Sequence, residues 1–411
     1  MAMRLLLAIY ASLIVLPAVA DGPPEDSKLK SLYEGRRWTE LYKALQAHRG
    51  PALYRGAIAA VFNEDHLAER LLRSVIASGP HSEEAYQAYE WLAHIYFRTG
   101  RYRQFIADLE ARWAAFPNKS ELKTEQAAAA GFRGLPDQWT GETRPWTLPH
   151  EPGKIFIPIS INGGSATYFF DTGAWVNCMS ESEAKRLGLA IHDTDGTLGT
   201  GTGARVGFRT AVAPEVVVGK IRFKDVSFAI FRDDQEPWSE LADGRRGLVG
   251  MPIILGLRSL RWTQDGRVEI GMKPAPGDRS ESNLFFDDDH LVVAAGVGQR
   301  RVLATLDTGA QTTDLYAAFA KEFADLLREA GKKDATEVRG VGNAETFDSI
   351  TLPEVRINIG HLDAELRPAH VLLKQIGAKC CVGNFGLDLL KQGRAFKIDL
   401  GAMTLNLEPN R

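Results

Sequence analysis

Two copies of one four-residue motif hold the residues of this sequence that are best suited to chemistry. The copies are Asp171-Thr172-Gly173-Ala174 and Asp307-Thr308-Gly309-Ala310, and each follows an apolar, strand-like run. If a fold brings the two aspartates within about 3 Å, both cannot ionise, so the carboxyl groups share one proton. One carboxyl can then act as a base toward water, and the other as an acid toward a carbonyl oxygen or a leaving amine. Such a pair could hydrolyse an amide bond without a metal or a covalent intermediate.

The two motifs occupy the same place in a duplicated segment. In each half the motif is followed by a predicted helix, at Glu181–Leu187 and at Ala317–Leu327. A glycine-rich hairpin, a strand pair, an apolar turn with a glycine and a closing hairpin come next, in the same order in both halves. The offset between the halves is 136 residues at the aspartates, and 133 residues when Gly250 is matched with Gly383. This repeated order predicts two similar β lobes.

Glycine content separates a helical part of the chain from a β part. Residues 25–135 hold 7 of the 39 glycines, whereas residues 151–411 hold 30. Apolar residues in the first part recur at helical spacing, with predicted turns near Gly35, Asn63, Gly100 and Gly134. The last two intervals, 37 and 34 residues, are close to the tetratricopeptide period. We therefore predict tetratricopeptide-like helical hairpins, which either dock a peptide or partner protein or only pack on the neighbouring domain.

The predicted organisation follows from these patterns and from two proline-rich or polar linkers. It comprises a signal peptide (1–20), a helical domain (25–135), a linker (136–150), a first β lobe (151–272), a second linker (273–283) and a second β lobe (284–411).

The first segment has the features of a secretory signal. Arg4 is followed by an apolar run at 5–16 and by the small-residue sequence Ala18-Val19-Ala20. We expect export to the periplasm or the medium, with no stable membrane insertion after cleavage; an uncleaved anchor is the alternative. A net charge of −3 provides no basic field for nucleic acid. The three cysteines lie outside CxxC spacing, which disfavours a disulfide scaffold or a cysteine-rich zinc site.

On these motifs the sequence resembles the aspartic peptidases over about residues 155–272 and 290–408. Alanine after each Asp-Thr-Gly is typical of the retropepsin branch, whereas the presence of both lobes on one chain resembles pepsin-like enzymes. The resemblance implies an N-terminal all-α region followed by an all-β bilobal fold of two retropepsin-like closed β-barrel lobes. It also implies that Asp171 and Asp307 form the catalytic dyad.

The resemblance implies supporting roles as well. The residues expected to support the active-site loops are Thr172, Gly173, Thr308, Gly309, Gly250 and Gly383. The threonines would brace the two loops against each other through hydroxyl and backbone contacts. The flap candidates are Gly201, Gly203, Gly340 and Gly342, since glycine supplies the flexibility that a closing flap needs. An ordinary tight turn is the alternative for each hairpin. Pro252 stands where the family usually has a polar residue.

These features predict an exported aspartic endopeptidase that acts on a peptide or protein substrate and needs no metal or organic cofactor. Because Ala174 and Ala310 have no hydroxyl to stabilise the carboxylates, we expect a pH optimum less acidic than pepsin's. The alternative is a catalytically inactive peptide-binding or scaffold module with the same fold. A phosphatase-like motif with Asp193 and Asp195 is disfavoured, because alternating β-α units do not follow it.

Overall fold

The structure is a computed structural model that describes residues 25–47, 50–120, 122–151, 155–274 and 279–410. The predicted signal peptide lies outside the described residues. The chain divides into two compact units, residues 1–50 and 51–411. Within the described part of the chain, no helix is both long enough and apolar enough to cross a membrane.

The N-terminal region is helical, as predicted. In the first unit α1 (Glu25–Glu34) and α2 (Trp38–Ala47) are joined by a turn at Gly35. The second unit begins with helices that pack on one another in chain order: α3 (Ala52–Val61), α4 (Asp65–Ser78), α5 (Glu83–Arg98) and α6 (Tyr102–Ala115). Helix α7 (Leu122–Ala129) and a short turn of 3₁₀ helix (Ala130–Phe132) complete this region. Its assignment as tetratricopeptide-like stays a prediction.

Local chemistry fixes the helix boundaries. Asn63, Gly100 and Gly134 have φ values of 60°, 70° and 77°, and each lies at a predicted turn. This left-handed conformation favours glycine and asparagine, so these residues interrupt the helices. At the start of α5 the Ser82 hydroxyl accepts a hydrogen bond from the Ala85 N–H at 3.1 Å, and Glu83 follows in the first turn.

The first lobe is a closed barrel. Its strands are β3 (Phe156–Ile161), β4 (Gly164–Phe170), β5 (Asn177–Ser180), β9 (Arg209–Val218), β10 (Ile221–Phe231) and β11 (Gly247–Val249). They pair in the order β10-β5-β11-β4-β3-β9, and β9 pairs with β10 to close the ring. Two short strands, β1 (Trp139–Thr140) and β6 (Ile191–His192), extend the sheet. Helix α8 (Glu181–Arg186) follows β5, and α9 (Met251–Leu257) follows β11.

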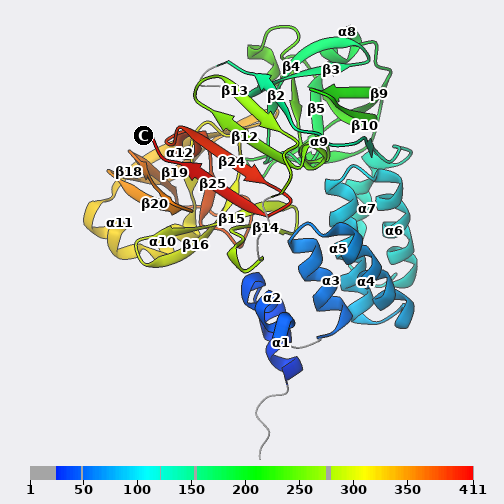
Figure 1. Ribbon diagram of the computed structural model, residues 1–411, viewed down its shortest axis with the longest axis horizontal. Helices are drawn as coiled ribbons and strands as arrows, with labels where there is room; N and C mark the ends of the chain where they lie inside the picture. Colours follow the sequence, from blue (N-terminus) through cyan, green and yellow to red (C-terminus); the bar gives the residue numbers. More distant parts are fainter. Residues whose placement is uncertain (1–24, 48–49, 121, 152–154, 275–278, 411) are drawn as a thin grey trace, which may run out of the picture. The chain divides into compact units, whose positions relative to one another are not determined.

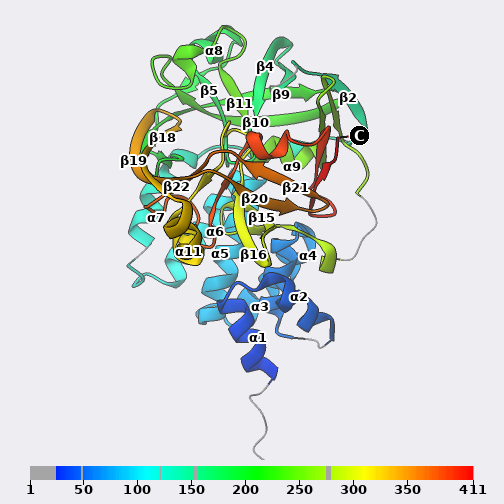
Figure 2. The same ribbon diagram turned by 90° about the vertical axis from the view of Figure 1, so that its left-hand side faces the viewer.

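The second lobe repeats this path but is not closed. Its strands are β14 (Leu284–Asp287), β15 (His290–Val297), β16 (Arg300–Leu306), β17 (Asp314–Leu315), β18 (Lys332–Gly340), β19 (Asn343–Leu352), β20 (Val355–Ile359), β21 (Leu362–Leu366), β22 (Ala369–Leu372) and β23 (Gly383–Phe385). Strands β18 and β19 form a long hairpin beside β22 (Figure 2). The predicted helix at 317–327 is divided at Phe323 into α10 (Ala317–Glu322) and α11 (Ala324–Ala330).

The open barrel corrects the expectation of two closed ones. In the first lobe, β9 and β10 pair in one register along both strands, and only the position of Pro214 and Asp225 is left unpaired. In the second lobe, the corresponding ladder is divided into β19–β22 and β20–β21, with Pro353 and Pro368 at the interruptions. Proline has no N–H to donate to a ladder, which agrees with the strand breaks at these two positions.

A five-stranded sheet joins the two lobes (Figure 1). Its order is β2 (Trp146–Pro149), β13 (Arg267–Ile270), β12 (Ser259–Thr263), β24 (Ala395–Asp399) and β25 (Thr404–Glu408). Strand β12 belongs to the closing hairpin of the first lobe and pairs with β24 of the second. Trp262 and Phe396 stack at this seam with ring centroids 5.6 Å apart. The closing hairpins of the duplication therefore hold the lobes together.

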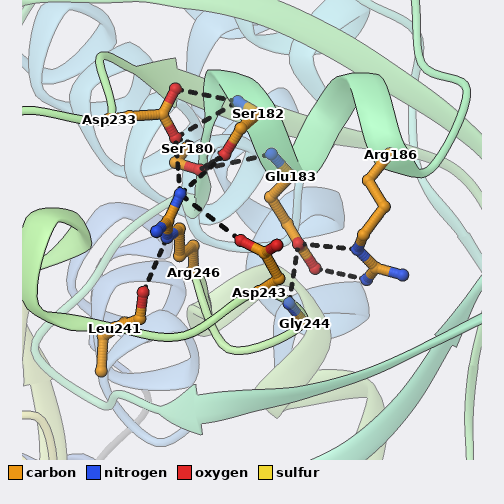
Figure 3. Close-up of polar contacts among 9 residues, drawn as sticks. All are labelled: Ser180, Ser182, Glu183, Arg186, Asp233, Leu241, Asp243, Gly244 and Arg246. Carbon is orange, nitrogen blue, oxygen red and sulfur yellow. Dashed lines mark hydrogen bonds and ion pairs between the residues drawn. The ribbon is translucent and has the colours of Figure 1, made fainter.

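A polar network fixes the end of β5 to the segment before β11 (Figure 3). The Arg246 guanidinium donates to the Leu241 carbonyl at 2.7 Å and to the Ser182 hydroxyl at 3.1 Å. The buried carboxylate of Glu183 accepts hydrogen bonds from Arg186 and from the Gly244 N–H. These contacts hold β5 and β11 in place, and both strands adjoin the first motif.

Candidate active site

The two Asp-Thr-Gly motifs leave equivalent strands in the two lobes. Strands β4 and β16 end at Phe170 and Leu306, one residue before the aspartates. The Asp171 N–H donates to the Val249 carbonyl at 3.0 Å, and the Asp307 N–H donates to the Phe385 carbonyl at 3.0 Å. Each aspartate is thus fixed by the strand that lies parallel to its own, β11 or β23.

The threonines join the two loops reciprocally. The Thr172 hydroxyl donates to the Leu306 carbonyl at 2.7 Å and accepts from the Thr308 N–H at 3.0 Å. The Thr308 hydroxyl donates to the Phe170 carbonyl at 2.6 Å and accepts from the Thr172 N–H at 3.1 Å. Both side chains are 1% exposed, so water cannot replace these bonds. Four hydrogen bonds therefore position the loops relative to each other.

Each motif glycine lies against the aspartate of the opposite loop. A Cβ on Gly173 would be 2.7 Å from the Asp307 carboxyl carbon, and one on Gly309 would be 2.5 Å from that of Asp171. Any other residue at these positions would displace the opposite carboxyl group. The glycines are needed for this close approach, which brings both aspartates to the same point between the lobes.

The two carboxyl groups are partly buried and coupled to each other. Asp171 lies within hydrogen-bonding reach of Asp307. Burial and the neighbouring carboxyl group raise the pKa of Asp171 well above its usual range, against the lowering effect of backbone N–H donors. The pair can therefore hold one proton between two carboxyl groups, as acid–base chemistry on a bound water requires.

The glycines in the turns beneath the two loops show that one residue pair was matched wrongly between the halves of the duplication. Gly250 begins α9, and a Cβ there would be 2.4 Å from the Val176 carbonyl oxygen. Its counterpart is Gly386, which begins α12 (Leu387–Leu390) and lies equally close to the Thr312 carbonyl. Gly383 instead corresponds to Gly247, at the start of the preceding strand. The match of Gly250 with Gly383 was wrong by three residues, and the corrected offset is 136, as at the aspartates.

The support beneath the loops differs between the lobes. In the second lobe the Asp388 carboxylate accepts from the N–H and hydroxyl of Thr313, and that hydroxyl accepts from the Gly386 N–H. Pro252 occupies the position of Asp388 in the first lobe. There Asn177 replaces the threonine, and its side-chain oxygen accepts from the Gly250 N–H at 3.0 Å. Asn177 therefore supports the first loop, although Pro252 cannot accept hydrogen bonds as Asp388 does in the second lobe.

The flap candidates lie at the ends of two hairpins. Gly201 and Gly203 lie in the turn between β7 (Thr197–Gly199) and β8 (Arg205–Gly207). Gly340 ends β18 and Gly342 lies in the turn before β19, and the Gly342 N–H donates to the Glu236 carbonyl of the first lobe at 2.8 Å. The second hairpin therefore reaches across to the first lobe. Their function as flaps stays a prediction.

Next to each aspartate, three residues pair across three neighbouring strands, and the side chains at these equivalent positions differ between the lobes. In the first lobe Phe169, Leu248 and Cys178 pair across β4, β11 and β5. The equivalent row in the second lobe is Thr305, Asn384 and Asp314. Asn384 donates to the Asp307 carboxylate at 2.8 Å. Burial, Asp388 and Asp307 raise the pKa of Asp314 to about 6.

Sequence reasoning missed both Asn384 and Asp314. The available signal was an asparagine inside an otherwise apolar turn, in the sequence Val382-Gly383-Asn384-Phe385.

The helical region packs on the first lobe beside this row. Tyr102 and Phe132 belong to one apolar cluster with Cys178 and Leu248. The ring of Phe132 lies 5.5 Å from that of Phe208, which follows the first hairpin. The helical part of the second unit therefore packs on the first lobe.

The competing acidic motif lies away from the dyad. Asp193 and Asp195 are exposed in the connection between β6 and β7, not at the end of a buried parallel strand. Within the described ranges of the chain, no group of three or more His, Cys, Asp or Glu side chains is arranged to hold a metal ion.

Comparison with known proteins agrees with the resemblance seen in the motifs. Residues 157–253, which include the first motif, match the family model described as aspartyl protease. The match confirms the predicted resemblance for the first lobe. No curated protein sequence matches the chain.

Two solved structures are also similar to parts of the chain. A retropepsin-like aspartic protease from Rickettsia conorii is 17% identical, with a TM-score of 0.23, over 32% of this chain and 92% of that one. The retroviral protease-like domain of Ddi1 from Leishmania major is 19% identical, with a TM-score of 0.20, over 29% of this chain and 87% of that one.

Proposed function

We propose that this protein is an aspartic endopeptidase that hydrolyses peptide bonds with a water molecule held between Asp171 and Asp307. The observation that carries the proposal is the reciprocal Thr172–Thr308 contact, which brings two carboxyl groups together against the opposite glycines. Two coupled carboxyl groups supply the base and the acid that amide hydrolysis needs.

The proposed reaction uses only groups that this chain supplies. One carboxylate removes a proton from the water as its oxygen bonds to the carbonyl carbon, and the protonated carboxyl donates to the carbonyl oxygen. When the resulting diol breaks down, the C–N bond breaks, the carboxyl that took the water proton donates it to the leaving amine, and a diol hydroxyl returns a proton to the other carboxylate. The raised pKa of Asp171 supports a pair that keeps one proton at moderately acidic pH.

Export is part of the proposal and depends on the first twenty residues of the sequence. The test is expression of the full chain, followed by fractionation and N-terminal sequencing of the product. A mature chain that starts at Asp21 in the exported fraction is expected. A full-length product retained in the cell membrane would favour the uncleaved anchor.

The proposed activity is tested by incubating the mature protein with a peptide library from pH 3 to 8. Cleavage is expected for the wild type and for Asp193→Asn, an exposed control, but not for Asp171→Asn or Asp307→Asn. A folded wild type that binds peptides without cleaving them across this range would favour the binding module. An optimum near pH 3 would contradict the expected less acidic optimum.

A further inference from the structure

The duplication provides an internal comparison for the environment of the two aspartates. Leu248 and Asn384 occupy equivalent positions on β11 and β23, each paired in register with the strand that leads to its aspartate. Leucine has no polar side-chain atom. The asparagine therefore introduces a donor on one side of an otherwise near-symmetric pair.

The asparagine amide is oriented toward Asp307. Its Nδ2 donates to Asp307 Oδ2 at 2.8 Å, and its Oδ1 accepts from the Thr305 hydroxyl at 2.5 Å. In this orientation both polar ends of the amide are paired, because the NH₂ group can donate to the carboxyl oxygen and the amide oxygen can accept from the hydroxyl. Thr305 is 8% exposed, and its hydroxyl lies between Asn384 and the Gly383 carbonyl. This arrangement holds the amide in one orientation.

The hydrogen bonds to the two carboxyl groups are unequal. Asp307 accepts from the N–H groups of Gly309 and Ala310, at 2.9 and 3.0 Å, and from Asn384. Apart from its contact with the Asp307 carboxyl group, Asp171 accepts only from the backbone among the residues that the structure describes, through the N–H groups of Gly173 and Ala174. Because donors stabilise the charged form of a carboxyl group, the negative charge of the pair is favoured at Asp307.

Given the proposed function, we infer that Asn384 is a positioning residue that assigns the two catalytic roles. It keeps Asp307 ionised, so that Asp307 is the base and Asp171 is the acid. In the first step Asp307 takes a proton from water, the water oxygen bonds to the carbonyl carbon, and the carbonyl oxygen takes the proton of Asp171. In the second step the C–N bond breaks, the amine takes the proton from Asp307, and a diol hydroxyl returns a proton to Asp171.

Other titratable groups lie near the pair and contribute to the pH dependence of its charge. Asp314 on β17, Asp388 on α12 and Tyr316 lie on the Asp307 side, and Cys178 on β5 lies on the Asp171 side. Among the described contacts, none of these side chains donates a hydrogen bond to Asp307.

The test is Asn384→Leu, which places the first-lobe residue in the second lobe. We would follow the aspartate carboxyl carbons by ¹³C NMR from pH 2 to 9, with signals assigned through Asp171→Asn and Asp307→Asn. In the wild type, the carbon of Asp171 is expected to respond in the second titration step of the pair, since its pKa is raised. Loss of a charge-assisted hydrogen bond should raise the first step of the pair by about one to two pH units in Asn384→Leu. The acidic limb of the kcat/KM profile should move by the same amount.

Two further variants keep the result interpretable. Asn358→Leu makes the same substitution at an exposed position of β20 and should leave the first step unchanged. Thr305→Val keeps the asparagine but removes the hydroxyl that orients it, and should raise the step by a smaller amount. It also tests the inference if Asn384→Leu does not fold.

The outcomes separate this inference from the proposed function. A first step that belongs to Asp171, or one that does not move in folded Asn384→Leu, would overturn the assignment of roles even if the protein cleaves peptides. A wild type that cleaves no peptide but shows the expected shift would overturn the peptidase proposal, while the effect of Asn384 on the pair would stand.

Discussion

The reciprocal threonine contact predicts a specific loss when one hydroxyl is removed. Thr172→Val keeps the branched shape of the side chain but deletes its donation to the Leu306 carbonyl and its acceptance from the Thr308 N–H. Because Thr172 is 1% exposed, both partners would be left in a site that water cannot reach. Thr308→Val removes the two equivalent bonds from the other loop and should behave alike.

The magnitude follows from the number of groups left unpaired. A buried group that loses its partner costs about 1–3 kcal/mol, so two such groups should lower the free energy of unfolding by about 2–6 kcal/mol. At about 2 °C per kcal/mol for a region of more than 200 residues, that corresponds to a decrease in Tm of roughly 4–12 °C. Displacement of one loop should also lower kcat/KM by about 100-fold, since small misplacements of catalytic groups are costly.

The assay is differential scanning fluorimetry together with peptide cleavage, using Thr172→Ser as the matched control. Serine keeps the hydroxyl and loses only a methyl group, so its Tm should remain within about 2 °C of the wild type. Equal losses in the valine and serine variants would refute the reasoning, because the hydroxyl would then not be what holds the loops.

Three further predictions concern neighbouring groups. Gly309→Ala places a Cβ 2.5 Å from the Asp171 carboxyl carbon and should abolish measurable cleavage, whereas Gly296→Ala, with no contact closer than 3.4 Å, should not. Because the pKa of Asp314 is raised to about 6, its neutral form stabilises the fold at low pH, and that stability is lost as the pH rises from about 4 through 6. Chemical denaturation should therefore show Asp314→Asn to be about 3 kcal/mol more stable than wild type at pH 8, with no such gain at pH 3. Burial opposes ionisation of Glu183, but its hydrogen bonds lower its pKa, so its contribution is present at neutral pH and lost as the pH falls below its ordinary value. Glu183→Gln should therefore cost about 3 kcal/mol at pH 7 and less at pH 3, and an equal cost at both would contradict the role of its charge.

The meeting of the two aspartate loops and the order of elements could be predicted from the sequence because local signals determine them. Each aspartate follows an apolar strand and precedes a threonine and a glycine, and the pattern occurs twice. The helix turns were also predictable, since Gly100 and Gly134 take left-handed conformations. The general fold class is confirmed by the sheet topology, with helices first and two β lobes after them.

Features that depend on comparing the halves position by position were harder to predict. Gly383 resembles Gly250 because both follow a valine, and only the backbone contacts of Gly386 show which glycine is equivalent. That three-residue shift concealed the match of Asn384 with Leu248, and thus the asymmetry of the pair. Pro353 and Pro368 were visible in the sequence, but their effect on barrel closure depends on which strands they interrupt.

Long-range packing had no local signal at all. The contact of Tyr102 and Phe132 with Cys178 joins parts of the chain that are far apart in sequence. An aromatic residue on a helix packs equally well in a hairpin core or on a neighbouring lobe, so the sequence alone does not distinguish the two.

The central claim is that Asp171 and Asp307 together hydrolyse peptide bonds, and one measurement tests it most directly. This is kcat/KM of the mature wild type, Asp171→Asn and Asp307→Asn on the best-cleaved library peptide, at the wild-type pH optimum and with matched Tm values. The structure predicts that each substitution lowers kcat/KM by about 1,000-fold or more, since each removes an acid–base group that the other cannot replace. A folded variant that retains activity within about tenfold of wild type would contradict the claim.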